Sequence, residues 1–198
     1  MSEVVLQVSA MSVDGRVTAE GTRVEAWASE PDPERDRWMT ESLSKASVHI
    51  MGATTYRSMS AYWPGSTEIF ADPMNRIPKA VFSRSLTSRD TRWGPVQICA
   101  GDTQEELARL RHDADGPVFA HGGIAFMRSL ARLDAVDEYR LVIGPWIDGS
   151  ADRLFQDVID GRRLSLTDLT RFPSGAFAAV YRRPQATRPP RRHPHEGL

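Results

Sequence analysis

Residues suited to phosphate chemistry gather in three short turns, each of which follows an apolar, strand-like run. In the first turn, Met51 is followed by Gly52, Ala53, Thr54 and Thr55. If a helix begins here, its free backbone N–H groups and the two threonine hydroxyls suit a phosphate. For this turn alone, the preferred interpretation is that a threonine simply caps the helix.

The second turn has paired glycines after an apolar run. Its residues in order are His121, Gly122, Gly123, Ile124, Ala125 and Phe126. Without side chains, the glycines let a pyrophosphate or a nicotinamide ring approach the backbone closely. The spacing is not GxGxxG, so no Rossmann fingerprint is claimed. Three roles are open for His121, which could be a ligand, a hydrogen-bond donor to a cofactor or simply a polar residue at a strand end.

The third turn places a hydroxyl beside a guanidinium, because Ser83 and Arg84 follow Val81 and Phe82. Arginine binds terminal phosphates well because it donates two parallel hydrogen bonds. A lone Ser-Arg pair is common at protein surfaces, but three such turns on successive strands favour a nucleotide site.

Alternating strand and helix patterns must position these turns. The pattern predicts strands over 4–11, 48–51, 80–82, 96–100 and 118–121, and helices over 33–45, 54–60, 103–111 and 124–133. Asp32 is the expected N-cap of the first helix, with Pro33 at its first position, and a loop is expected between 15 and 33. Repeated strand-then-helix steps indicate right-handed crossovers and a mostly parallel sheet.

The last part of the chain changes character, because strands are predicted over 138–143, 163–170 and 176–182 with no long helix between the last two. These strands are expected to pair antiparallel. The predicted class is therefore α/β, with a mixed sheet, helices on both faces and a site outside the carboxyl ends of the parallel strands.

Composition indicates one globular domain, since hydrophobic residues make up 40% and charged residues 26% of 198 residues. The net charge is −1, but five arginines lie after residue 181 among prolines, which leaves about −5 on the rest. We therefore expect a domain over 1–183 and a disordered Pro/Arg-rich tail over 184–198, and no nucleic-acid partner.

Cys99 is the single cysteine, so neither an internal disulfide nor a zinc framework is expected. The first residues form no signal peptide and no apolar stretch long enough for a membrane span. These features predict a cytoplasmic protein that binds no membrane and no metal.

Taken together, the motifs resemble the dihydrofolate reductase superfamily, and within it the reductase domain of the riboflavin-biosynthesis deaminase-reductases. The resemblance covers roughly residues 3 to 183. The motifs that carry it are Met11 to Gly15, Gly52 to Tyr56, Lys79 to Leu86, His121 to Gly123, and Leu133 to Phe155. It implies a three-layer α-β-α fold and a reductase that transfers hydride from NADPH to a small heterocyclic or ribosylamino-pyrimidine substrate.

The resemblance also assigns a cofactor site. The two glycine turns would hold the pyrophosphate, Ser83 and Arg84 would meet the adenosine 2′-phosphate, and Ala10 and Val17 would border the nicotinamide. Two positions depart from the family pattern. Ala53 stands where arginine is usual, which puts the preference for NADPH over NADH in doubt, and Ala151 stands where a second glycine is common.

Two carboxylates are candidates for the proton donor that hydride transfer requires. In dihydrofolate reductases a helical acid precedes the corresponding glycine turn, and a gapless count back from Gly52 reaches Asp36. The charged residues around Asp36 favour a solvated helix face over this role. Asp14 lies in the turn after the first strand, where riboflavin-type reductases place substrate-facing residues. An ordinary Asp-Gly turn explains Asp14 equally well.

Two other functions remain open. The chain could be a catalytically weak nucleotide-binding homodimer of the same fold, or a dihydrofolate reductase, which the substrate-side residues match less well. The resemblance makes a homodimer plausible, through the late strands and the helix over 124–133.

Overall fold

In the computed structural model, residues 1–17, 23–149, 153–158 and 160–184 are described. Ala151 and the predicted tail from residue 185 onward lie outside these ranges. No helix within the described ranges is long and apolar enough to cross a membrane, and the same residues contain no cluster of potential metal ligands.

One eight-stranded sheet forms the centre of the described structure, in the order β4-β3-β2-β5-β1-β6-β8-β7. The first six strands in this order run parallel, whereas β8 pairs antiparallel with both β6 and β7. The bounds are β1 Val4–Met11, β2 Val48–Gly52, β3 Lys79–Phe82, β4 Val96–Cys99, β5 Val118–His121, β6 Glu138–Ile143, β7 Ser165–Arg171 and β8 Phe177–Arg182. The expected mixed sheet with antiparallel late strands is thereby confirmed.

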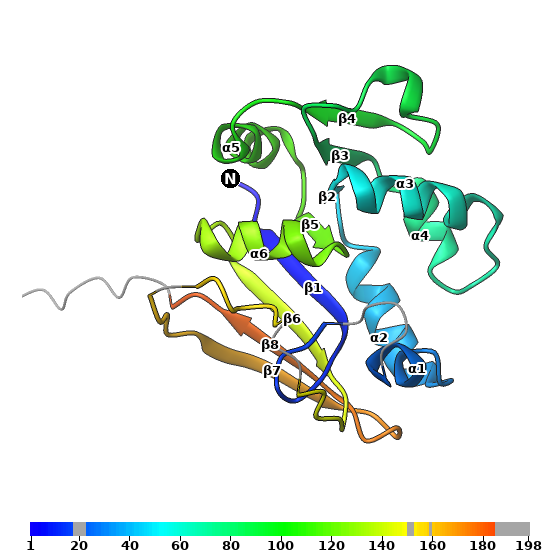
Figure 1. Cartoon of the computed structure of the whole chain (residues 1–198), viewed down its shortest axis with the longest axis vertical. Coiled ribbons are helices and arrows are strands. Elements are labelled where there is room, and N and C mark those ends of the chain that lie inside the picture. The colour runs from blue at the N-terminus through cyan, green and yellow to red at the C-terminus, as the bar shows by residue number, and fades with distance from the viewer. Residues whose placement is uncertain (18–22, 150–152, 159, 185–198) are drawn as a thin grey trace, which may run out of the picture.

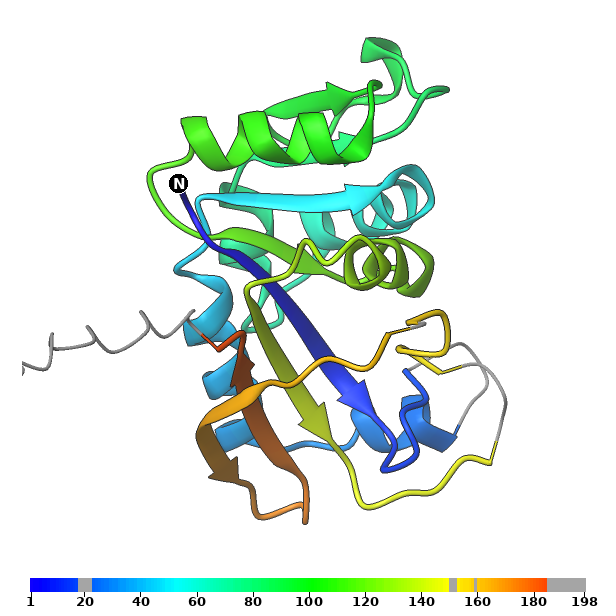
Figure 2. The same ribbon diagram turned by 90° about the vertical axis from the view of Figure 1, so that its left-hand side faces the viewer.

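Helices cover both faces of the sheet and produce three layers (Figures 1 and 2). Their bounds are α1 Arg23–Ala28, α2 Pro33–Leu43, α3 Ala53–Tyr62, α4 Ala71–Arg76, α5 Thr103–Asp113 and α6 Ile124–Arg132, with short 3₁₀ turns η1 Trp63–Gly65 and η2 Ser88–Asp90. In Figure 2, α5 crosses in front of the sheet and α2 lies behind it, while α6 is seen almost end-on beside the arrowhead of β5.

The α2 helix begins as predicted, because the Asp32 side chain accepts a hydrogen bond from the backbone N–H of Arg35 and Pro33 occupies the first turn. The loop expected between 15 and 33 is wrong in part, since α1 lies within it. A six-residue helix has too few periodic positions to reveal itself in the sequence. Packing holds it instead, because Trp27 is only 2% exposed and lies against Gly144. The short helix α4 was likewise not predicted.

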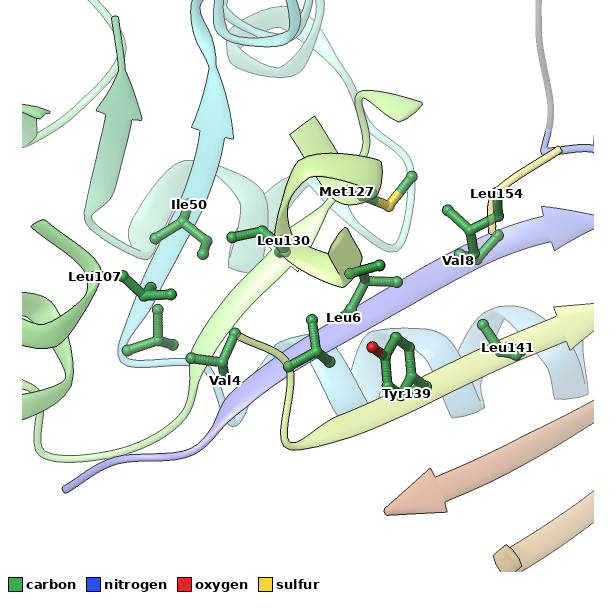
Figure 3. Packing of buried hydrophobic residues seen from close by; sticks show 14 of the residues in the cluster. Val4, Leu6, Val8, Ile50, Leu107, Met127, Leu130, Tyr139, Leu141 and Leu154 are labelled. Carbon is green, nitrogen blue, oxygen red and sulfur yellow. The ribbon is translucent and has the colours of Figure 1, made fainter. Parts of the chain in front are cut away.

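The front core lies between the sheet and the two helices α5 and α6. Leu6 and Val4 of β1 meet Leu130 of α6 and Leu107 of α5, and all four side chains are almost completely buried (Figure 3). Burying each such side chain stabilises the fold by about 1.5–3 kcal/mol. This cluster therefore fixes α6, and with it the turn that precedes the helix.

The rear core, beneath α2, α3 and α4, includes charged and titratable groups. Lys79 is 1% exposed, with its Nζ donating to the carbonyl of Asn75 at 3.0 Å and lying 4.3 Å from the centre of the Trp93 ring. Burial lowers the pKa of Lys79 to about 8. Next to it in register, His49 is 1% exposed and neither ring nitrogen has a partner among the described residues. Burial lowers the pKa of His49 well below its ordinary value of 6.5, as do the nearby His121 and Lys79.

The edge strand β7 is exposed along most of its length, and Leu166 and Leu169 are about half exposed. The homodimer predicted through these late strands stays a prediction.

Replacing His49 by phenylalanine should reduce the acid sensitivity of the fold. Folded His49 and His121 both stay neutral below pH 6.5, whereas the unfolded chain takes up protons there, so stability falls as the pH is lowered. Each such histidine lowers the free energy of unfolding by up to about 1.4 kcal/mol for every unit by which the pH is lowered. Urea unfolding at pH 7, 6 and 5 should show a shallower decline for His49→Phe. The exposed His112 provides the control, and His112→Phe should keep the wild-type slope. Equal slopes for His49→Phe and wild type would contradict this account.

Candidate functional site

The two glycine turns lie side by side at one edge of the sheet. Gly52 ends β2, and Gly122 follows the last residue of β5, which pairs parallel with β2. In Figure 2 the arrowheads of β2 and β5 point to the same edge, where α3 and α6 begin. The predicted convergence of the Gly52 and Gly122–Gly123 turns is therefore present.

These turns touch so closely that a side chain at the glycines would collide. A Cβ on Gly123 would lie 2.2 Å from the Thr55 hydroxyl oxygen, and one on Gly122 would lie 2.7 Å from the methyl carbon of Met59. Both glycines also have a positive φ, +93° at Gly122 and +79° at Gly123, which residues with a Cβ rarely adopt. Glycine is thus required here for contact and for conformation.

Two helix N-termini open onto this junction. The α3 helix has Gly52 as its N-cap and α6 has Gly123, and neither cap has a side-chain hydrogen bond. The hydroxyls of Thr54 and Thr55 have no hydrogen-bond partner in the described part of the chain, so the idea that they merely cap α3 lacks support. The first N–H groups of both helices need partners, and they carry partial positive charge. An anion with several oxygens, such as a pyrophosphate, satisfies both needs.

An aromatic pair forms the wall beside the glycine junction. The rings of Phe82, at the end of β3, and Phe126, in the first turn of α6, lie 5.0 Å apart, and Gly52 lies close to Phe126. Ile124 is half-buried and Ala125 is exposed at the start of α6. Phe82 and Met59 were not assigned to the site from the sequence, because a strand or helix pattern gives no sign of which residue faces the neighbouring turn.

The third turn lies next in line along the same edge. Gly52 pairs in register with Phe82, the last residue of β3, and Ser83 directly follows Phe82. The Ser83 hydroxyl accepts hydrogen bonds from the backbone N–H groups of Ser85 and Leu86, at 3.2 and 3.0 Å, and so shapes the turn. Arg84 is exposed and available to an anion at the rim.

His121 stands directly before the paired glycines and is half-buried. Burial lowers its pKa to about 4, so the imidazole is neutral at physiological pH. Its Nδ1 is enclosed and has no partner among the described residues. A neutral imidazole of this kind can hydrogen-bond to a ligand but is a poor source of protons.

Asp14 joins two loops at the carboxyl ends of β1 and β6. One carboxylate oxygen accepts from the Ser12 hydroxyl at 2.7 Å and the backbone N–H of Asp148 at 3.0 Å, while the other accepts from the N–H of Gly149 at 2.9 Å. These hydrogen bonds hold the pKa of Asp14 far below its ordinary value of 3.8, with the bond from Asp148 contributing most. These hydrogen bonds suit Asp14 to holding the two loops together, and they make it a poor proton donor.

The remaining predicted residues lie on elements other than those that form the glycine junction. Asp36 lies on α2 with its carboxylate 3.2 Å from Nε of Arg35 and its side chain 29% exposed. One turn further on, Met39 packs in the same buried cluster as Ala10, whereas Val17 belongs to the front core. The assignments of Asp36, Ala10 and Val17 therefore stay predictions.

A family model described as the RibD C-terminal domain matches residues 3–178. Two proteins of Bacillus subtilis (strain 168) are similar in sequence, and both are called uncharacterized. YyaP is 24% identical over 177 residues, covering 87% of this chain and 90% of its own, and YwjB is 23% identical over 163 residues, covering 82% and 88%.

Solved structures of low identity share the fold. A putative riboflavin biosynthesis protein from Shewanella sp. PV-4 has a TM-score of 0.72 at 16% identity, with 93% of this chain and all of that chain covered. The diaminohydroxyphosphoribosylaminopyrimidine deaminase/5-amino-6-(5-phosphoribosylamino)uracil reductase of Thermotoga maritima has a TM-score of 0.63 at 17% identity, covering 92% of this chain and 56% of that one. These likenesses confirm the expected three-layer α-β-α fold with a mixed, mostly parallel sheet.

Replacing Gly123 by alanine should destabilise the protein. The left-handed backbone alone costs a residue with a Cβ about 1–2 kcal/mol, and the collision with Thr55 adds to this. Urea unfolding should show the loss, and the additional change Thr55→Ala should recover only the part due to the hydroxyl. Gly65→Ala is the control, because nothing lies within 4 Å of a Cβ there. Equal stability of Gly123→Ala and Gly65→Ala would rule out the close contact.

Replacing Asp14 by asparagine should destabilise the protein at neutral pH but not in strong acid. Because the folded pKa of Asp14 is lowered, its contribution is present above pH 3.8 and is lost as the pH falls further. The melting-temperature difference between Asp14→Asn and wild type should therefore stay constant from pH 6 to pH 4 and shrink as the pH is lowered from pH 4 to pH 2. Asp115→Asn, at an exposed loop position, should show no such trend. A difference that does not change with pH would mean that the Asp14 charge is not what joins the loops.

Proposed function

Because a family model matches residues 3–178, the chain belongs to the RibD C-terminal domain family, and we propose that it is a reductase that uses NADPH. The observation that carries the proposal is the junction of two helix N-termini at Gly52 and Gly123, with neither glycine capped by a side chain. Such a junction suits the pyrophosphate of a dinucleotide.

The residues at this edge fit a dinucleotide along its length. Backbone N–H groups at the starts of α3 and α6 would bind the pyrophosphate, helped by the Thr54 and Thr55 hydroxyls. Arg84 and the Ser83 hydroxyl would receive an adenosine 2′-phosphate one strand further out. Such a phosphate would favour NADPH over NADH, although Ala53 supplies no guanidinium of its own. When bound, NADPH supplies the hydride.

The substrate class that we propose is a small heterocycle or a ribosylamino-pyrimidine. Support comes from the Thermotoga maritima protein, whose name specifies 5-amino-6-(5-phosphoribosylamino)uracil reductase. The proton that accompanies the hydride requires a nearby acid. Because the hydrogen bonds of Asp14 lower its pKa, Asp36 is the better candidate for this role.

A second candidate is a nucleotide-binding protein with weak chemistry. Three hydrogen-bond donors bind the Asp14 carboxylate, so one of the two possible acids is unsuited to proton transfer. This observation favours the second candidate. Turnover separates the two functions, since both require the nucleotide to bind.

Fluorescence titration should show that the purified chain binds NADPH more tightly than NADH. Arg84→Ala should weaken NADPH binding by about tenfold, as expected for one lost charge-assisted hydrogen bond, and should change NADH binding little. Arg89→Ala, at an exposed position of η2, is the matched control.

Oxidation of NADPH with the riboflavin-pathway ribosylamino-pyrimidine would then assign the reductase, whereas turnover of dihydrofolate alone would assign a folate reductase. Binding without turnover would favour the second candidate, and absence of binding to either nucleotide would refute both.

A further inference from the structure

A row of polar side chains crosses the rear face of the sheet beneath α2 and ends at the glycine junction. Gln7 of β1 pairs in register with His121 of β5 on one side and with Arg140 of β6 on the other. Residues paired in this way project from the same face of the sheet and lie one strand spacing apart. His121 is thus the end of the row that reaches the candidate cofactor site.

Two atoms in this row are enclosed without a hydrogen bond. They are Oε1 of Gln7, whose residue is 1% exposed, and Nδ1 of His121. The other end of the Gln7 amide is directed to α2, because its Nε2 donates to the Met39 carbonyl at 3.5 Å. Buried polar atoms are nearly always paired in folded proteins. Gln7 therefore has an acceptor left to offer, and the neighbouring imidazole has a nitrogen that can carry a proton.

The other polar groups around His121 are engaged elsewhere or lie further along the row. Arg140 contacts the Glu138 carboxylate and the Ser42 hydroxyl, and Glu138 in turn contacts Arg182. His49 lies on the neighbouring strand β2 and is itself buried and neutral. Lys79 stands beyond His49, and Asp36 of α2 pairs with Arg35. None of the hydrogen bonds of the described residues gives His121 a carboxylate partner.

Neither Gln7 Oε1 nor His121 Nδ1 has a hydrogen-bond partner among the described residues. We propose that the two pair with each other, with Oε1 accepting the Nδ1–H, which leaves Nε2 of His121 as a hydrogen-bond acceptor for a ligand at the glycine junction. Gln7 is then a positioning residue that fixes the imidazole tautomer. His121 contributes to recognition, and its neutral state excludes it as the proton donor. The ligand chemistry that fits is an N–H donor on a planar ring system, either the nicotinamide carboxamide or a ring amide of the substrate. This inference deepens the proposed function and rests on it only for the identity of the ligand.

The tautomer is measurable in the protein alone. Histidine labelled with ¹⁵N in the full chain should show, in long-range ¹H–¹⁵N spectra at pH 7, that His121 carries its proton on Nδ1. The His121→Asn variant assigns the signal. Gln7→Leu should move the proton to Nε2, whereas Gln97→Leu, at an exposed position of β4, should leave the spectrum unchanged. A proton on Nε2 in the wild type, or a tautomer that Gln7→Leu does not alter, would overturn the proposal.

Ligands then test whether Nε2 of His121 accepts a hydrogen bond. The probes are NADP⁺, its 3-acetylpyridine analogue, which lacks the carboxamide N–H, and uracil, which has ring N–H groups. A shift of the Nε2 resonance with NADP⁺ but not with the analogue identifies the carboxamide as the donor, and Gln7→Leu should then weaken NADP⁺ binding by about tenfold. A shift with uracil alone identifies the substrate side.

The two proposals fail in different ways. If NADP⁺ binds without moving Nε2 and uracil does not move it either, the acceptor role is refuted while the nucleotide site stands. If NADP⁺ does not bind at all, the proposed function fails, yet the Gln7–His121 hydrogen bond is still decided by the tautomer of the protein alone.

Discussion

The contact between Thr55 and Gly123 is the constraint on which the candidate site depends. It is possible only because Gly123 has no Cβ, and it brings the first turn of α3 against the first turn of α6. Each helix is held from behind by its own part of the core, with Met127 and Leu130 of α6 in the front layer and Tyr56 of α3 in the rear layer. The cores therefore aim two helix N-termini at one point, and the glycines keep that point open.

A second junction, at the ends of β1 and β6, depends on a charge. Asp14 ties the turn after β1 to the loop after β6, and the same loops also share a backbone hydrogen bond from Val13 to the carbonyl of Trp146. Asparagine could keep some of these contacts, but a carboxylate accepts hydrogen bonds from backbone N–H groups more strongly. The aspartate that the motif suggested as a catalytic acid is thus used to connect the two loops.

The fold itself does not decide the chemistry. Solved structures at 13–17% identity share the fold of this chain. What distinguishes one such protein from another lies in the side chains at the carboxyl edge of the sheet. In this chain they include Ala53, which is small, and His121, which is neutral and pairs in register with Gln7.

The sequence by itself determined the strands, the longer helices and the three turns, because these follow from short-range rules. Periodicity marks a strand or a helix, Asp32 caps α2, and paired glycines mark a sharp turn. It did not determine α1, whose six residues depend on the contact of Trp27 with Gly144. Only the tertiary structure decided that Thr55 lies against Gly123, that Asp14 joins two loops, and that Gln7 and His121 are neighbours. These partners are between 68 and 135 residues apart in the chain, so only the strand order and the register bring them together.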